Sequence, residues 1–171
     1  TSAQLAAIPS TTLNTLTSTQ LDALTTAQVR ALTTDQIVGL GSTHIPQLTS
    51  AQIGALTTAQ LGVITTAQFD LLSTQQIDAL TTAQVASLAN ATLNGLTSTQ
   101  FAALTTSQVR SLTTAQVAAL ATVNFDAMGS NQLRSLTSAQ LAAIPSTSLN
   151  TLTSTQLDAL TTAQVRALTT D

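Results

Sequence analysis

The chain has 171 residues, 43% hydrophobic and only 2% aromatic, and its 7 acidic and 4 basic side chains give a net charge of −3. Four scattered positive charges cannot neutralise a run of phosphates, so we expect no nucleic-acid binding. No apolar stretch approaches the length of about 18 residues that crosses a membrane, so we expect no membrane insertion. The absence of cysteine excludes disulfides, thiolate metal ligands and a cysteine nucleophile.

The dominant feature of the sequence is an eight-residue repeat. One octad reads Leu24-Thr-Thr-Ala-Gln-Val-Arg-Ala31, and the register runs without a slip from Ile8 to Asp171. Because neither an insertion nor a linker interrupts it, we predict that residues 1–171 form a single uninterrupted repeat array.

A longer repeat is superimposed on the octads. Residues 1–35 return as residues 137–171, an offset of 136 residues, with Thr12 replaced by Ser148 as the single change. Other octads differ freely from one another, so this near-identity indicates that a whole block was duplicated. We therefore expect the chain to be a piece of a longer tandem protein.

Each octad position has its own residue preference. The first position is Leu, Ile or Met and the sixth is Leu, Ile, Val or Phe, which predicts two buried rows. The seventh position carries most of the charge, which predicts an exposed row. Its charged members are Asp22, Arg30, Asp70, Asp78, Arg110, Asp126, Arg134, Asp158 and Arg166.

The fifth position is Gln in most octads and is never Glu. Gln and Glu have similar helix propensities, so a solvated position would accept either residue. We therefore predict that the amide is at least partly buried and hydrogen-bonded, where a carboxylate would be costly. The exceptions in this row are Thr12, His44, Thr92, Asn124 and Ser148.

The octad period indicates an all-α solenoid of short capped helices, one per octad. Two helical turns take about 7.2 residues, so an apolar stripe of period eight would smear around one continuous helix. Thr25 and Gln28 instead have the spacing of a capping box at the start of a short helix. Such a helix is unstable alone and needs its neighbours, as in a solenoid.

Some octads carry no Ser or Thr at the second position, and there we expect the cap to move to the third. The residues concerned are Pro9, Gly41, Ala89, Ala121, Gly129 and Pro145. The alternative fold is a β-solenoid, which the Thr-rich rows and a ladder of Gln side chains would suit. Only 6 glycines are available for its corners, which weighs against it.

Candidate chemical sites are scarce. His44 is the single histidine, stands in the Gln row, and is interpreted as a hydrogen-bonding substitute for Gln rather than as a catalytic residue. The Asp residues at the seventh position are interrupted by Arg and lack the spacing of calcium loops. We therefore predict no enzyme activity and no catalytic, cofactor-binding or metal-binding residues.

The Leu-Thr-Thr-Ala-Gln-Val-x-Ala octads resemble the Thr/Ala/Gln-rich tandem repeats of very large bacterial surface or secreted adhesin-like proteins. The resemblance implies an extracellular or cell-surface location and a structural role as a rod, stalk or filament element. Because the first and last full octads carry the same apolar rows as the others, we expect self-association or continuity end to end. The alternative is a ligand-binding surface built on the Ser/Thr rows, with ice or a surface polysaccharide as the partner.

Overall fold

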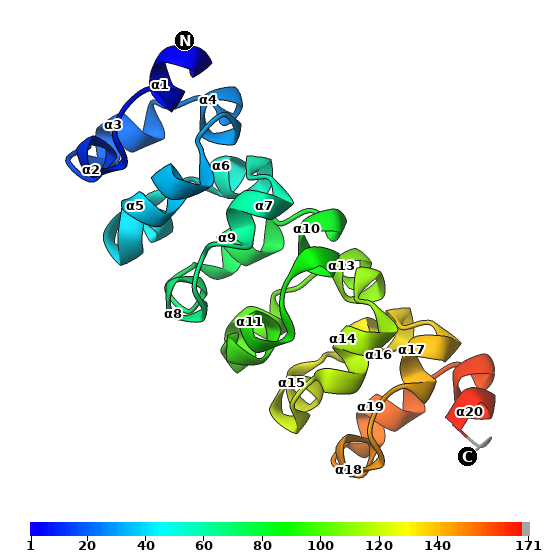
Figure 1. Cartoon of the computed structure of the whole chain (residues 1–171). Helices are drawn as coiled ribbons and strands as arrows, with labels where there is room; N and C mark the ends of the chain where they lie inside the picture. Colours follow the sequence, from blue (N-terminus) through cyan, green and yellow to red (C-terminus); the bar gives the residue numbers. More distant parts are fainter. Residues whose placement is uncertain (169–171) are drawn as a thin grey trace. The chain divides into compact units, whose positions relative to one another are not determined.

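The structure, a computed structural model, describes residues 1–168 (Figure 1). In these residues short α-helices follow one another along the whole chain, with one 3-10 helix and no strand. The predicted all-α repeat solenoid is confirmed, and the alternative β-solenoid is wrong because each Thr-rich segment caps a helix instead of pairing as a strand.

The chain divides into two compact units, one of residues Thr1–Leu88 and one that begins at Ala89. The division falls inside the octad 88–95, where the register has no insertion. The first unit contains α1 (Ser2–Ala6), α2 (Ser10–Leu13), α3 (Ser18–Asp22), α4 (Thr26–Arg30), α5 (Thr34–His44), η1 (Ile45–Gln47), α6 (Ser50–Ala55), α7 (Thr58–Leu61), α8 (Thr66–Phe69), α9 (Thr74–Asp78) and α10 (Thr82–Ser87). The second contains α11 (Asn90–Gly95), α12 (Ser98–Ala102), α13 (Thr106–Ser111), α14 (Thr114–Ala119), α15 (Thr122–Ala127), α16 (Ser130–Ser135), α17 (Ser138–Ala142), α18 (Ser146–Leu149), α19 (Ser154–Asp158) and α20 (Thr162–Leu168).

Most helices begin at a capping box, as the spacing of Thr25 and Gln28 predicts. The Thr25 hydroxyl accepts a hydrogen bond from the Gln28 backbone N–H at 3.2 Å, and the Gln28 side-chain oxygen accepts one from the Thr25 N–H at 2.8 Å. These two bonds satisfy N–H groups that have no partner inside the helix. The extended backbone of Thr25 then separates α4 from α3, so each octad forms its own helix.

The octads without a second-position hydroxyl correct one expectation. The N-cap stays at the second octad position, and α2, α11, α15, α16 and α18 have their first helical residue at the third, as the other helices do. The N-cap residue of these five helices accepts no hydrogen bond with its side chain. These N-cap residues are Pro9, Ala89, Ala121, Gly129 and Pro145. Packing between octads, rather than the cap alone, therefore fixes where the helix starts.

Gly41 produces a different irregularity. It lies inside α5 with φ 60° and ψ −171°, a left-handed backbone that glycine adopts without steric cost, and it kinks the element between two octads. The eleven-residue α5 is thus two short helices joined at Gly41. The period of one helix per octad continues through the kink.

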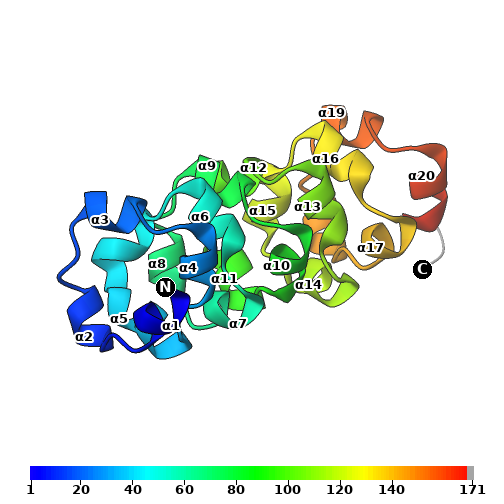
Figure 2. The ribbon, with the colours of Figure 1, turned by 90° about the horizontal axis from the view of Figure 1, so that it is seen from above.

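Helices three octads apart along the chain pack against each other. In the first unit α2 contacts α5 and α6 contacts α9, and both pairs lie side by side in the two views (Figures 1 and 2). In the second unit the same spacing joins α12 to α15, α13 to α16 and α17 to α20. The inter-turn hydrogen bonds of Gln52 join residues 28 and 31 positions apart. Each unit therefore winds with between three and four octads in a superhelical turn.

The first and sixth octad positions form the core, and the charged seventh-position side chains are exposed, as predicted. Val29, Ile53 and Leu133 at the sixth position have no exposed surface. Residues of the two rows are more exposed where no further superhelical turn is described. Leu24 is half-buried, and Leu157 and Val165 are 43% and 45% exposed. Stacking of turns, and not the octad by itself, therefore buries these rows.

Two neighbouring residues of α16 test this assignment. Leu133→Asp places a carboxylate where no surface is exposed, and we expect it to destabilise the fold by about 4 kcal/mol or more. Arg134→Ala changes an exposed side chain and should stay within about 0.5 kcal/mol of the parent. Urea unfolding followed by circular dichroism measures both changes. Similar shifts for the two variants would contradict the octad register.

Candidate functional site: the buried glutamine row

The glutamine row is the polar centre of the fold, and its two side-chain ends bind different partners. In Gln52 the oxygen Oε1 accepts a hydrogen bond from the Thr49 backbone N–H at 2.8 Å and so closes the local capping box. The nitrogen Nε2 donates to the carbonyl oxygens of Leu21 and Leu24, both at 2.8 Å. Gln52 is only 2% exposed. One carboxamide thus starts its own helix and ties it to the preceding superhelical turn.

The same inter-turn bond recurs in both units. In each case Nε2 donates to the carbonyl of the first-position residue 28 positions earlier. The glutamines that do so are Gln36, Gln52, Gln60, Gln76, Gln84, Gln132, Gln140, Gln156 and Gln164. All are buried. The predicted buried and paired amide is confirmed for these residues.

The exclusion of Glu follows from this division of labour. A Glu would close a capping box as well as Gln does, because the box needs only an acceptor. The inter-turn bond needs a donor, and an ionised carboxylate has none. Gln20 provides the comparison: its oxygen accepts the Thr17 N–H at 2.8 Å, but its side chain is exposed and no described turn precedes it. The inter-turn donation therefore selects Gln over Glu.

His44 takes the place of Gln in its octad, as the sequence suggested. Its Nε2 lies 3.0 Å from the carbonyl oxygen of Leu16, which is 28 residues earlier, and its Nδ1 lies 3.1 Å from the carbonyl oxygen of Leu40. A neutral imidazole can donate from one of these nitrogens, and a protonated imidazole can donate from both. His44 thus reproduces the inter-turn contact of the glutamines.

Asn124 is a further substitution in the row, and a second asparagine compensates for its shorter side chain. Asn124 Nδ2 donates to the Leu93 carbonyl at 3.3 Å and to Asn94 Oδ1 at 3.0 Å. Asn94 Oδ1 also accepts the N–H of Ala121 at 2.8 Å, the bond that Gln Oε1 would otherwise accept. Asn94 Nδ2 donates to the Ala119 carbonyl at 2.8 Å. Asn94 therefore supplies the acceptor that Asn124 cannot place.

The sequence analysis missed this role of Asn94, because Asn94 stands at the seventh position, outside the Gln row. The available signal is the pairing itself: an Asn in place of Gln, with another Asn 30 residues earlier. The compensation is incomplete, since Asn124 Oδ1 is buried without a hydrogen-bond partner. This octad is the least satisfied part of the row.

The residues considered for chemistry stay apart. The Asp and Arg side chains of the seventh position lie exposed along the helices, and Asp126 accepts a hydrogen bond from the Thr151 hydroxyl at 2.7 Å. Within residues 1–168, no three His, Asp, Glu or Cys side chains gather as a metal site would require. No described helix is long and apolar enough to cross a bilayer. The expectation of no catalytic, cofactor or metal residues stays a prediction.

Gln84→Glu isolates the inter-turn bond. Gln84 is 2% exposed and donates to the carbonyls of Ile53 and Leu56, so a carboxylate there would face two acceptors. We expect a loss of about 3 kcal/mol at pH 7. The buried carboxyl holds its proton more tightly when folded, so the loss should appear above about pH 4.3 and shrink below it. Chemical unfolding at several pH values measures it.

Gln20→Glu is the matched control, because its capping box is the same but its side chain is exposed. It should change the free energy of unfolding by no more than about 0.5 kcal/mol. Equal losses at positions 20 and 84 would mean that the capping box, and not the inter-turn bond, excludes Glu.

Asn94→Ala tests the compensation for the short Asn124 side chain. It removes the acceptor for the Ala121 N–H and for Asn124 Nδ2, and we expect a loss of about 2 to 3 kcal/mol. Adding Asn124→Gln should restore most of the loss, since a Gln reaches its own N-cap. Asn131→Ala, an exposed change on α16, serves as the control. Thermal unfolding of the four proteins gives the result, and no recovery in the double variant would disprove the compensation.

The chain matches a known repeat family. The family model of the ALTTAQ repeat matches residues 1–34, 20–50, 33–66 and 90–122, more than half of the chain, in tandem. The six letters of that name occur at residues 23–28, 55–60, 79–84 and 159–164. No curated protein and no solved structure matches the chain. The chain therefore belongs to the ALTTAQ repeat family and is a structural repeat element.

Proposed function

We propose that this chain is a rod or stalk element of a long bacterial extracellular or cell-surface protein, continuous with further repeats or self-associating end to end. The observation that carries the proposal is the inter-turn glutamine bond. The amides of the nine inter-turn glutamines bind carbonyls of the same repeat type one turn earlier, as Gln52 binds Leu21 and Leu24. Whole superhelical turns can therefore be added through the same hydrogen bonds that join the existing turns. This property suits a protein whose role is to span a distance.

The use of the hydroxyl groups supports the same role. At the second position Thr25, Thr57 and Thr81 accept hydrogen bonds from the N–H of the Gln three residues later. These hydroxyls serve the fold, whereas a surface for ice or polysaccharide needs hydroxyls free to bind a ligand. Some third-position threonines, such as Thr26, are exposed, but no further observation joins them to a ligand. We therefore place the structural role first.

The bacterial and extracellular setting rests on the resemblance of the octads to the Thr/Ala/Gln-rich repeats of large surface proteins. In this proposal the partners are adjoining repeats or other copies of the chain, and the chain has no catalytic role. The exposed charges of the seventh position include both signs, for example Asp22 and Arg30. Such a surface suits a spacer that holds other parts apart.

The length of the particle tests the rod. Residues 36–171 can be appended after Asp171, because Asp171 corresponds to Asp35 across the 136-residue offset and the octad register is kept. Small-angle X-ray scattering of the parent and the lengthened protein should show a larger maximum dimension at an unchanged cross-section. A lengthened protein that becomes thicker instead of longer would contradict the rod.

The location and self-association need separate measurements. An antiserum against the chain should label intact source cells as strongly as permeabilised cells. Label that appears after permeabilisation alone would refute the surface location. Light scattering of the parent protein over a range of concentrations then separates a self-associating element from one that is continuous within a single chain.

A further inference from the structure

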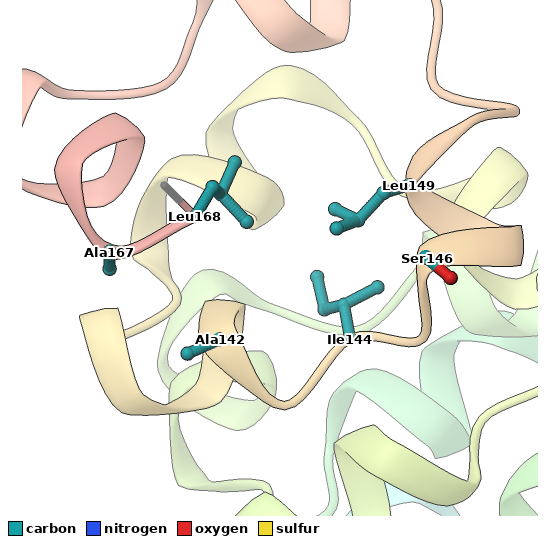
Figure 3. Close-up of a pocket in the computed structure, with 6 residues that line it drawn as sticks. All are labelled: Ala142, Ile144, Ser146, Leu149, Ala167 and Leu168. Carbon is teal, nitrogen blue, oxygen red and sulfur yellow. The ribbon is translucent and has the colours of Figure 1, made fainter. Parts of the chain in front are cut away.

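One cavity in the second unit lies between α17, α18 and α20 and has a volume of about 210 Å³. In Figure 3 the side chains of Ile144, Leu149 and Leu168 point toward the same space. The remaining lining residues are Ala142, Ser146 and Ala167. Five of the six lining residues have apolar side chains, and polar atoms of the backbone and of Ser146 complete the wall, which α17, α18 and α20 build within the block 137–168.

The duplicated block shows what the same surface binds elsewhere. All six lining residues recur 136 positions earlier, as Ala6, Ile8, Ser10, Leu13, Ala31 and Leu32. In that copy α5 packs against α2, and Leu13 is 1% exposed, whereas its counterpart Leu149 is half-buried. The identical surface in the first unit is thus covered by the octads that begin at Leu32 and Leu40.

The covering segment makes specific polar contacts. Gln36 Nε2 donates to the carbonyl oxygens of Leu5 at 3.0 Å, Ala6 at 3.3 Å and Ile8 at 2.7 Å. The counterparts of these three acceptors are the carbonyls of Leu141, Ala142 and Ile144. The rim of the cavity therefore carries the backbone acceptors that a Gln of this row binds.

Gly39 of the covering segment lies close against Ser10 of α2. A Cβ added to Gly39 would lie 2.7 Å from the Cβ of Ser10, closer than side chains pack. Ser146 is the counterpart of Ser10 in the cavity. An occupant that packs on the cavity as residues 36–40 pack on α2 therefore needs Gly three residues after its Gln, as Gln36 and Gly39 provide.

We propose that the cavity is a docking site for a further repeat segment of the Gln36–Leu40 type, with Gln at the fifth octad position and Gly at the eighth. The Gln amide binds the carbonyls of Leu141, Ala142 and Ile144, and the apolar residues of the segment cover Leu149. The inference rests on the proposed role as an extendable repeat and adds the sequence feature that the docking segment carries.

The first turn of a second copy is a poorer occupant. It offers Gln4 and Leu5, but it has Ala7 where the segment has Gly39. The side chain of Ala7 would meet Ser146 as a Cβ at Gly39 would meet Ser10. The cavity therefore favours a Gly-bearing repeat over end-to-end contact between identical copies.

The test appends residues 36–72 after Asp171 and reports on the cavity with Leu149→Cys, which is the single thiol because the parent has no cysteine. We expect the extension to slow alkylation of this thiol at least tenfold compared with the unextended Leu149→Cys protein. Gly39→Ala within the extension should return the rate to near the unextended value. Adding Ser146→Gly should then restore part of the protection, since it removes the Cβ contact but leaves the backbone contacts, which at Ser10 are 3.1 Å to the oxygen and 3.3 Å to the carbonyl carbon.

Each outcome decides the proposal. An extension that gives no protection, or that protects equally with Gly39→Ala, overturns it. Protection that appears in the unextended protein as its concentration rises would make a second copy the occupant and would also overturn it. The proposed function fails differently, by a lengthened particle that does not grow in its maximum dimension, and that result can occur with the cavity occupied or empty.

Discussion

The primary carboxamide of glutamine is the group on which this fold depends. Its oxygen is an acceptor and its nitrogen, about 2 Å away, is a donor. The two atoms bind partners at different distances along the sequence. The acceptor organises the octad to which it belongs, and the donor reaches carbonyls 28 residues away, as in Gln60 with Leu32. A helix of four to seven residues has too few internal hydrogen bonds to persist alone. The carboxamide couples each such helix to a neighbour and so makes the set stable.

The exceptions in the row show what the fold requires there. His44 is a different ring with a different shape, yet it places a nitrogen on the same carbonyl 28 residues earlier. Asn124 has the correct chemistry but lacks the reach, and Asn94 completes the arrangement from the preceding turn. His44 thus delivers the same inter-turn contact as Gln with another side chain. Asn124 donates to other acceptors, and buried Ser148 bonds Thr122 instead. Asn94 compensates for the short side chain of Asn124.

Much of the fold could be predicted from the residues. The capping-box spacing of Thr25 and Gln28 located the helix starts, and the absence of Glu identified a buried amide. The partners of that amide could not be predicted, because an octad period does not say how many octads make a turn. Nor could the helix starts at Pro9 and Ala89, where packing against other turns holds the helix without a hydroxyl cap. The residues of one octad were enough to predict the helix of that octad. The superhelical winding depends on contacts between residues far apart in the sequence.

The spacing of the inter-turn bonds has a consequence for how such genes can change. If a whole octad were lost, each Gln within the next 28 residues would meet the first-position carbonyl of a different octad, because every octad offers one, and later glutamines would keep their partners. Unequal recombination in units of eight codons therefore leaves the bonding pattern unchanged over most of the array. The intervals 10–39 and 94–124 are different, since Ser10 must stay opposite Gly39 and Asn94 opposite Asn124. Copy number can drift freely, while these two intervals keep a fixed count of octads.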